Sequence, residues 1–429
     1  MDKLLESALM KKLQSAGDKI GSNKAINAIQ GALMGSMGII MVGAIFQILA
    51  AVPTNFGLFE VGSDIYNTLY GIYNLTMNFL SVWFVLQLGY NYAKALKLKP
   101  MTGAINATIC FLIVATTGYS AAAMESISTG FLGGTGLFIA ILVGLTTTWI
   151  YKFCVSKNIV IKMPDVVPPF LSESFSAIIP LFLSTILWVG VSAGTKALTG
   201  VTFPELFIGL ISMPLSYLTG FWGMLVLGII GGLLWIFGIH GTMMMYVAVM
   251  PVMFDAMAKN AAAFQAGGIE ALVYYPVVLF GFVQVAGGTG NTIGAAIYGL
   301  KAKSEQIRAV AKAGIIPSVF NINEPITFGY PIMYNPILAI PYILNIVVAM
   351  VIGHIAYIIG WNIPGYITIG SVMPIGVGEF LSTLRFNNTI TALIIVVVTS
   401  LIWIPFMKAY DKQLYAKEQA DKALENNNQ

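Results

Sequence analysis

Long stretches without a charged residue dominate the sequence. Four such stretches follow one another between Lys24 and Lys152, and charged residues near positions 60–64, 94–99 and 125 separate them. Each stretch holds close to the ~20 apolar residues that a helix needs to cross a lipid bilayer. The alternation of polar and apolar residues that marks a membrane β-barrel is absent, so the pattern predicts membrane-spanning helices. We expect spans near residues 27–51, 65–93, 101–124, 130–151, 174–195, 337–360 and 388–407.

The second half of the sequence is less regular than the first. From Leu206 to Phe254 there is no charged residue, over roughly twice the length of one span. Seven glycines from Gly220 to Gly241 interrupt this run. The run therefore predicts two spans, or one span and part of a hairpin, joined without a polar loop.

Prolines break the segment between Gly314 and Pro336 more strongly. Four prolines recur there every five to eight residues, around two asparagines and Glu324. A straight lipid-facing helix cannot hold so many prolines. Irregular backbone survives at membrane depth only where it lines a cavity or is buried in protein, so we predict a re-entrant segment. Hydrophobic segments broken by Gly and Pro also mark the binding sites of transporters.

Composition supports a membrane protein and excludes a soluble one. Of 429 residues, 57% are hydrophobic and 9% are charged, which is too little polar surface to coat a soluble core of this size. The net charge of +4 does not indicate a nucleic-acid partner, because the basic residues form no single patch. They recur at alternate breaks between the hydrophobic runs, so the positive-inside rule predicts a cytoplasmic N-terminus. Lys408 and Lys412 after the last span predict a cytoplasmic C-terminus too, and hence an even number of crossings.

The two ends and one connector are polar. Residues 1–23 lack the apolar stretch and cleavage site of a signal peptide, and they predict a cytoplasmic amphipathic helix at the membrane surface. Residues 408–429 predict a short cytoplasmic tail. Lys152–Glu173 contains three prolines and cannot form one continuous helix. Cys110 and Cys154 do not suggest a disulfide framework, and we expect both to be packing residues.

The two histidines of the chain lie in unlike surroundings. A polar side chain within the membrane needs a partner, so each is a candidate functional residue. His354 lies among aliphatic residues of a predicted span, and we expect it to hydrogen-bond a neighbouring helix. His240 is flanked by Gly238 and Gly241. Because glycines open the backbone where a substrate can approach, we place His240 in a candidate site.

Glu324 is the strongest candidate for a functional residue. A carboxyl group at the centre of a span costs about 2.5–3.5 kcal/mol on insertion scales, so its presence among apolar residues needs a compensating role. Asn321 and Asn323 supply hydrogen-bond donors and acceptors beside it, and we expect Pro325 to keep Glu324 out of the helical conformation. Such a cluster suits a polyhydroxylated ligand. The alternative is a carboxylate that only caps a broken helix.

Other motifs do not indicate a familiar class of enzyme. Gly288–Gly294 is glycine-rich, but its spacing fits neither a Walker loop nor a dinucleotide fingerprint, so we interpret it as a kink in a membrane hairpin. The cysteines and histidines lack the spacing of metal ligands, and two histidines give little support to a hydrolytic triad. We therefore expect neither a metal nor a cofactor.

Five segments carry a resemblance to a known family. They are Val167–Phe175, Leu234–Gly241, Ala286–Gly290, Phe320–Gly329 and Ile404–Asp411. Together they resemble the EIIC subunits of the lactose, cellobiose and chitobiose branch of the phosphoenolpyruvate-dependent phosphotransferase system. The resemblance runs in order from about Lys24 to Asp411, and five motifs in sequence are far more specific than any one of them.

The resemblance implies an all-α polytopic protein of the bacterial cell membrane, with about ten transmembrane helices plus re-entrant hairpins. It implies that residues 24–173 form a dimerisation domain, so that the protein is a homodimer. It also implies that residues 174–407 bind the sugar and move it across the membrane.

The same resemblance assigns roles to five residues. Glu324 and His240 would contact the sugar hydroxyl that receives the phosphoryl group, and these two are the candidate catalytic residues. Asn323 and the backbone near Gly290 would line the same pocket. Trp235 is a weaker candidate for packing against a pyranose ring.

The function that the resemblance implies is group translocation. A β-linked disaccharide is imported and phosphorylated on the cytoplasmic side by a separate phospho-EIIB, which acts downstream of EIIA. Some relatives carry a fused EIIB domain with a phosphocysteine, and the sequence around Cys154 does not look like that loop.

The alternative function is that of a cation-coupled secondary transporter with Glu324 as the proton carrier. Uptake of unmodified sugar that depends on a proton gradient would indicate it. Proton relays usually contain several intramembrane acids, and their scarcity here speaks against this alternative. A passive channel or scaffold would leave the broken segment around Glu324 unexplained.

Overall fold

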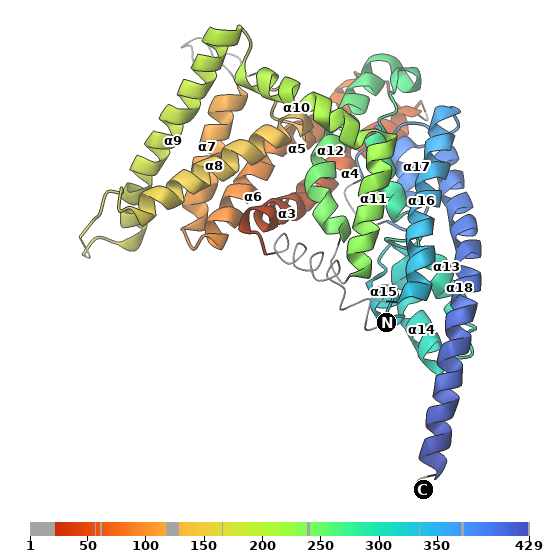
Figure 1. The fold of residues 1–429 in the computed structure, drawn as a ribbon. Coiled ribbons are helices and arrows are strands. Elements are labelled where there is room, and N and C mark those ends of the chain that lie inside the picture. The colour runs from red at the N-terminus through yellow and green to blue at the C-terminus, as the bar shows by residue number, and fades with distance from the viewer. Residues whose placement is uncertain are drawn as a thin grey trace. The chain divides into compact units, whose positions relative to one another are not determined.

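The structure is a computed structural model that describes residues 22–55, 57–60, 62–116, 128–164, 166–237, 241–333, 335–369 and 373–427. These residues form helices and no strand (Figure 1). The all-α fold class predicted from the sequence is therefore confirmed. The amphipathic helix predicted for residues 1–23 lies, except for its last two residues, outside the part of the chain that the structure describes.

The chain folds into two compact units. The N-terminal unit comprises the described residues up to Tyr217 together with Met250–Ala262, and the C-terminal unit comprises Leu218–Val249 and the described residues from Ala263 onward. The first elements in chain order are α3 (Lys24–Gly35), α4 (Met37–Asn55), α5 (Asp64–Met77), α6 (Leu80–Ala95), α7 (Pro100–Ala115), η2 (Gly134–Gly136), α8 (Leu137–Ser156), α9 (Pro169–Thr199) and α10 (Phe203–Thr219). They are followed by α11 (Phe221–Ile236), α12 (Gly241–Gly267), η3 (Gly268–Ala271), η4 (Pro276–Val283), α13 (Ile293–Gly299), α14 (Glu305–Val319), α15 (Glu324–Gly329), α16 (Pro336–Ile358), α17 (Val377–Thr383) and α18 (Phe386–Asn427).

Helix α6 is the centre of the N-terminal unit. It packs against α3, α7 and α8, and its apolar residues Leu80, Phe84 and Leu88 are buried. Two glycines let α6 and α7 approach closely, since a Cβ atom at Gly89 would lie 2.6 Å from the carbonyl oxygen of Gly103. Small residues at helix contacts are typical of membrane proteins, where close backbone packing replaces the hydrophobic driving force.

Large apolar side chains point outward along the long helices, as expected of lipid-facing surfaces. On α9, Phe182 is 61% exposed and Ile186 is 54% exposed. Within the described residues, seven helices are long and apolar enough to cross a membrane, and Pro100–Ala115 and Phe221–Ile236 are shorter apolar helices. Each of the seven spans predicted from the sequence overlaps one of these helices. The prediction of a polytopic helical membrane protein is thus confirmed.

Helices α16 and α18 form the centre of the C-terminal unit. They pack against each other, and α16 also packs against α11 and η4. Tyr342, Ile346 and Trp403 are fully buried at these contacts. Helix α16 begins where Asn335 accepts hydrogen bonds from two backbone N–H groups of its first turn, which replaces partners that the helix itself cannot supply.

The irregular segments are broken as the sequence predicts, and one is broken more often. Helix α8 ends at Ser156 and α9 begins at Pro169, so the connector after the fourth span is not one helix. The charge-free run from Leu206 to Phe254 holds three helical pieces, not two, because α10 ends before Gly220 and α11 ends at Ile236.

The proline-rich segment between Gly314 and Pro336 forms three pieces, the end of α14, the six-residue α15 and the start of α16. Pro325 and Pro336 lie at the beginnings of α15 and α16. A helix tolerates proline there because the first backbone N–H groups have no partner within the helix. The predicted break in this segment is therefore confirmed.

Both cysteines are packing residues, as predicted. Cys110 on α7 and Cys154 on α8 are free thiols, and each is fully buried.

Candidate functional site

A glycine-rich turn joins η4 to α13 and forms the centre of the candidate site. Gly287, Gly288 and Gly290 have φ angles of 89°, 82° and 80°, in the left-handed region that side chains rarely adopt. A Cβ atom at Gly288 would lie 2.6 Å from Cγ of Asn323, and one at Gly290 would overlap the ring of Tyr342. The glycines are therefore required both for the backbone conformation and for close approach of neighbouring side chains.

The buried side chain of Asn291 holds this turn in place. Its Oδ1 accepts a hydrogen bond from the backbone N–H of Ala286 at 2.9 Å. Its Nδ2 donates to the carbonyl oxygens of Phe282 at 3.1 Å and Asn345 at 3.3 Å. The indole of Trp403 on α18 donates to the carbonyl oxygen of Asn291 at 2.9 Å. The turn thus has hydrogen-bonded partners on η4, α16 and α18.

The second broken segment docks on the same turn through two asparagines. Asn321, itself at φ 61°, accepts a hydrogen bond from the backbone N–H of Gly287 at 2.8 Å. The amide of Asn323 donates to the carbonyl oxygen of Thr289 at 2.6 Å. These contacts bring together the Gly288–Gly294 motif and the Glu324 cluster, which the sequence presents as separate features. The glycine-rich motif thus forms a turn between η4 and α13, and its interpretation as a kink in a membrane hairpin stays a prediction.

Glu324 is the first residue of α15 and is half-buried. The expectation that Pro325 keeps Glu324 out of the helical conformation is wrong. Pro325 occupies the second position of α15, where a helix needs no backbone N–H, so the helix starts one residue before it. The carboxylate therefore follows directly after Asn323, whose amide is held by the turn.

Trp235 reaches the turn through two threonines. The Trp235 side chain is 3% exposed, and its indole N–H donates to Oγ1 of Thr242 at 3.2 Å. The hydroxyls of Thr242 and Thr289 are hydrogen-bonded at 2.8 Å. The Trp235 ring also meets Phe328 edge to face, with centroids 6.0 Å apart. Trp235 is thus joined to the same network as Asn323.

Sequence reasoning missed the two threonines of this network. Thr242 follows Gly241 in a motif that was singled out for its histidine, and Thr289 lies inside the glycine-rich motif. Their positions in these two motifs were the available signal. A threonine hydroxyl is common in helices and turns, so nothing in the residue type predicts that the two side chains meet.

Of the two histidines, the structure describes His354 but not His240. His240 lies outside the described residues, although Trp235 and Thr242 flank it in the sequence. His354 hydrogen-bonds the hydroxyl of Tyr274 through Nδ1 at 2.9 Å and stacks on Phe221 at 4.0 Å. The hydrogen bond expected of His354 is present, but its partner Tyr274 lies in the loop between η3 and η4 and not on a helix.

The described residues therefore bring Trp235, Gly290 and Asn323 to one network, and Glu324 follows Asn323 directly in the chain. The carboxylate and the amide groups can hydrogen-bond several hydroxyls at once. The residues of the glycine turn are themselves buried, and the ring of Trp235 is joined to them through Thr242 and Thr289. Within the same residues, no group of three His, Cys, Asp or Glu side chains could hold a metal ion. The chemistry of the site suits a neutral ligand with many hydroxyls.

Comparison with known proteins gives the family. The family described as "Phosphotransferase system, EIIC" matches residues 30–345. The chain is 30% identical to the lactose-specific EIICB component of Lacticaseibacillus casei, over 95% of this chain and 72% of that protein. It is 29% identical to the cellobiose-specific EIIC component of Geobacillus stearothermophilus, over 99% of this chain and 98% of that protein.

A solved structure has the same fold. The crystal structure of the transporter ChbC, the IIC component of the N,N'-diacetylchitobiose-specific phosphotransferase system, superimposes with a TM-score of 0.87 at 27% identity. The match covers 97% of this chain and 99% of that one. Because the family match extends over more than half of the sequence, the chain belongs to the EIIC family, the membrane-spanning permease components of the phosphotransferase system.

Proposed function

We propose that the protein imports a β-linked disaccharide and that a separate phospho-EIIB phosphorylates the sugar on the cytoplasmic side. The relatives named for lactose, cellobiose and diacetylchitobiose all handle sugars of this class. Both cysteines of the chain are fully buried in helices, so neither is placed to carry a phosphoryl group to a bound sugar. This supports a donor cysteine on a partner, with EIIA upstream of it.

The observation that carries the proposal is the position of Glu324 beside the fixed amide of Asn323. Glu324 is the only acidic residue between Glu305 and Glu379. Its neighbour Asn323 is 3% exposed and is anchored to the carbonyl oxygen of Thr289. The surroundings of Glu324 are mostly apolar, so the local dielectric constant is low. A hydrogen bond to a carboxylate is stronger in such surroundings than in water. The carboxylate of Glu324 therefore suits recognition of the acceptor hydroxyl.

In the proposed reaction, Glu324 accepts the proton of the acceptor hydroxyl as the hydroxyl oxygen attacks the phosphorus atom. The sulfur–phosphorus bond of the donor breaks, and the cysteine thiolate of EIIB leaves. General-base catalysis requires first that the base reaches the proton and second that its pKa is suitable. His240 would orient the same hydroxyl, while Asn323, Gly290 and Trp235 hold the walls of the pocket.

The N-terminal half of the chain, residues 24–173, would form the dimer contact, and both termini would face the cytoplasm. The orientation rests on the alternation of basic and acidic breaks between the predicted spans.

Replacement of Glu324 by Gln tests the proposal. Glu324→Gln keeps the shape of the side chain but removes its charge, so sugar affinity should fall by about 1.5–3 kcal/mol, or about 10- to 150-fold in Kd. Phosphotransfer from phospho-EIIB should fall further, because a general base typically contributes about 10²–10⁴-fold. Calorimetry with cellobiose, lactose and diacetylchitobiose measures the first effect, and phosphotransfer assays with the purified protein measure the second.

Two variants serve as comparisons. Glu270→Gln removes an exposed carboxylate of η3 and should leave sugar binding and phosphotransfer unchanged. His240→Gln should weaken sugar binding with a smaller loss in phosphotransfer. A Glu324→Gln protein that elutes normally in size exclusion and has wild-type binding and turnover would remove Glu324 from the site.

A further inference from the structure

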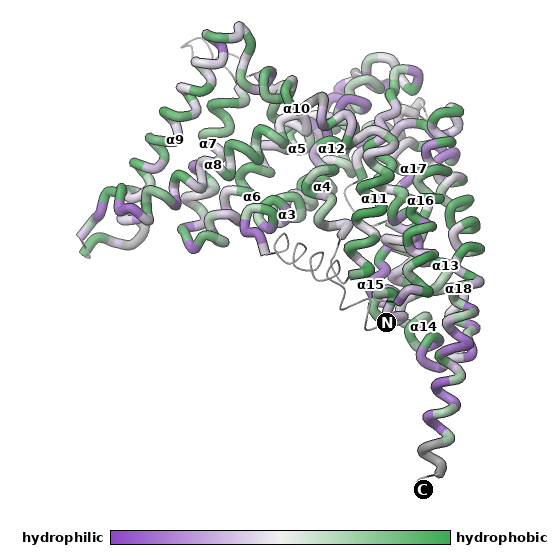
Figure 2. Tube along the Cα trace, viewed as in Figure 1, coloured by the Kyte–Doolittle hydropathy of each residue, from purple (hydrophilic) through white to green (hydrophobic). Residues whose placement is uncertain are grey.

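The last helix, α18, is much longer than a membrane span. It has 42 residues, and at about 1.5 Å per residue it is about 63 Å long, roughly twice the ~30 Å thickness of the hydrocarbon core. Figure 2 shows that the helix changes from hydrophobic to hydrophilic toward its C-terminus. The part from Lys408 onward therefore extends beyond the lipid on the side that the sequence assigns to the cytoplasm.

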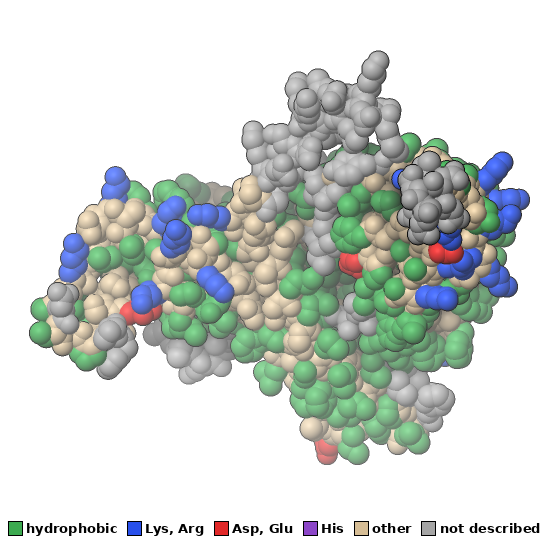
Figure 3. All heavy atoms as spheres, turned by 90° about the horizontal axis from the view of Figure 1, so that it is seen from below, with side chains coloured by type: hydrophobic (Ala, Val, Ile, Leu, Met, Phe, Trp, Pro, Cys, Tyr) green, Lys and Arg blue, Asp and Glu red, His purple; other side chains and the backbone are tan. Residues whose placement is uncertain are grey.

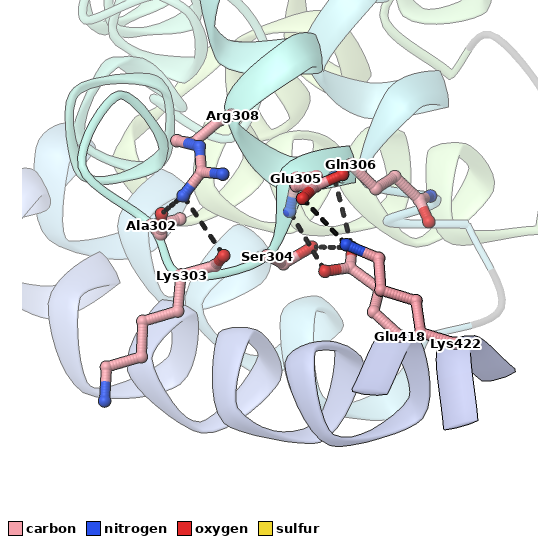
Figure 4. A network of polar contacts seen from close by, with 8 residues as sticks. All are labelled: Ala302, Lys303, Ser304, Glu305, Gln306, Arg308, Glu418 and Lys422. Atoms are coloured by element: carbon pink, nitrogen blue, oxygen red, sulfur yellow. Dashed lines mark hydrogen bonds and ion pairs between the residues drawn. The ribbon is translucent and has the colours of Figure 1, made fainter. Parts of the chain in front are cut away.

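Two carboxylates on this extension bind the N-terminus of α14. Asp411 is 4% exposed and accepts hydrogen bonds from the backbone N–H groups of Lys303 at 3.0 Å and Ser304 at 2.8 Å. Glu418 accepts from the hydroxyl of Ser304 at 2.6 Å and from the backbone N–H groups of the next two residues at 3.0 and 3.2 Å (Figure 4). The extension of α18 is thereby fixed against the start of α14.

Most acidic side chains of this region take part in the contact between α14 and α18. Lys422 pairs with Glu305 at 2.9 Å, so three of the four acidic residues in residues 301–312 and 408–422 are engaged in contacts between α14 and α18. The same ranges contain eight basic residues, which leaves a formal charge of +4.

The basic side chains face outward. Lys301, Lys303, Lys312, Lys408, Lys412 and Lys417 are exposed, and among the described residues no ion pair engages them. Figure 4 shows the ammonium group of Lys303 pointing away from the polar network. Figure 3 shows Lys and Arg side chains gathered around the end of the C-terminal unit. We define these six lysines as the basic surface.

We propose that the basic surface docks the phosphorylated EIIB protein. The inference rests on the proposed function, which requires such a donor. A phosphoryl group carries a charge of about −1.5 to −2 near neutral pH, so a positive surface attracts the phosphorylated form of the donor more strongly than the free form. The surface is also connected to the site, because α14 leads through four residues to Glu324 at the start of α15.

Anionic lipid is the competing occupant of a cytoplasmic basic surface. Lys417 lies nine residues beyond Lys408 on α18, so it lies about 14 Å farther along the helix. This separation exceeds the Debye length of about 8 Å at physiological salt. The headgroup layer is itself about 5–7 Å thick on each side, so Lys417 lies about 6–8 Å outside it, close to one Debye length. The field of the headgroups is therefore weaker at Lys417 than at Lys408, and a protein partner can contact this outer part of the surface.

The test removes three lysine side chains for which no hydrogen bond of the α14–α18 contact is seen, in the variant Lys303→Ala/Lys312→Ala/Lys417→Ala. The backbone N–H of Lys303, which donates to Asp411, is kept in this variant. The matched control removes three exposed lysines of the N-terminal unit, Lys94, Lys152 and Lys157. Each protein is placed in nanodiscs of phosphatidylcholine. The probes are the EIIB proteins of lactose, cellobiose and diacetylchitobiose systems, phosphorylated and unphosphorylated. Each of them is measured both for binding and for phosphotransfer.

At low salt, association of phospho-EIIB with the triple variant should be about tenfold slower than with the parent, and the difference should shrink as salt is raised. The control should associate like the parent, and sugar binding measured by calorimetry should be the same in all three proteins. Unchanged association of the variant, or an equal loss in the control, overturns the docking surface.

Two further outcomes separate the related hypotheses. If the variant loses binding only to vesicles that contain phosphatidylglycerol and keeps its association with phospho-EIIB, the surface is a lipid site and the proposal is wrong. If the parent protein binds phospho-EIIB through these lysines but transfers no phosphate to any sugar, the docking surface is supported and the proposed function is refuted.

Discussion

Substitution of Gly290 by alanine is the sharpest test of the turn that organises the candidate site. Gly290 has a φ angle of 80°, and an alanine there is strained by about 1–2 kcal/mol. The added Cβ atom would lie 2.8 Å from Cγ of Tyr342, with Cδ2 and Cε2 of the ring closer still. Overpacking of a buried contact costs a further ~1–3 kcal/mol. We expect the free energy of unfolding to fall by about 2–5 kcal/mol.

The functional consequence follows from the hydrogen bonds of the turn. Thr289 precedes Gly290 and holds the amide of Asn323 through its carbonyl oxygen, so a displaced turn moves the residue before Glu324. Because a misplacement of about 1 Å can cost about 10²-fold in rate, phosphotransfer should fall by about that factor. The melting temperature of the purified protein should fall by on the order of 10 °C.

The control is Gly268→Ala. Gly268 also has a positive φ angle, 68°, but nothing lies within 4 Å of an added Cβ atom. The Gly268→Ala variant should therefore show only the backbone strain of an alanine at a positive φ angle. Its free energy of unfolding should fall by about 1–2 kcal/mol, and its sugar binding should be unchanged. Combining Gly290→Ala with Tyr342→Leu should cost less than the sum of the two single variants, because the smaller side chain removes the overlap. A Gly290→Ala protein with wild-type melting and sugar binding would refute the described packing of the turn.

Two further predictions concern topology and the cysteines. Single cysteines at Lys97 and Lys157 should react with a membrane-impermeant thiol reagent only from the cytoplasmic side and one at Glu60 only from outside; the reverse pattern would contradict the orientation. All three positions are exposed. Replacement of both Cys110 and Cys154 by Ala should leave phosphotransfer from phospho-EIIB intact, since both thiols are buried packing groups. Loss of phosphotransfer in a folded double variant would show that one of these cysteines takes part in the reaction.

Local patterns in the sequence were enough to predict the helices and their breaks, and they singled out several residues of the candidate site. The length of an apolar run shows whether a helix can span the lipid, and proline and glycine mark interruptions of a helix. Both signals are local and do not depend on the rest of the chain. Glu324 and Asn323 stood out for a similar reason, because polar groups among apolar residues require partners. The conformation of Glu324 was predicted wrongly. The residue before a proline usually avoids the helical conformation, but here Glu324 is the first residue of α15.

Only the tertiary structure decided which polar groups meet. Ser304 and Asp411 are 107 residues apart in the sequence and hydrogen-bond, and Trp403 bonds the carbonyl oxygen of Asn291 across 112 residues. In several of these contacts one partner is a backbone group, which every residue possesses and which leaves no mark on the sequence. Hydrophobic patterning determines what is buried or faces lipid, whereas the choice of hydrogen-bond partners depends on how helices far apart in the chain pack together.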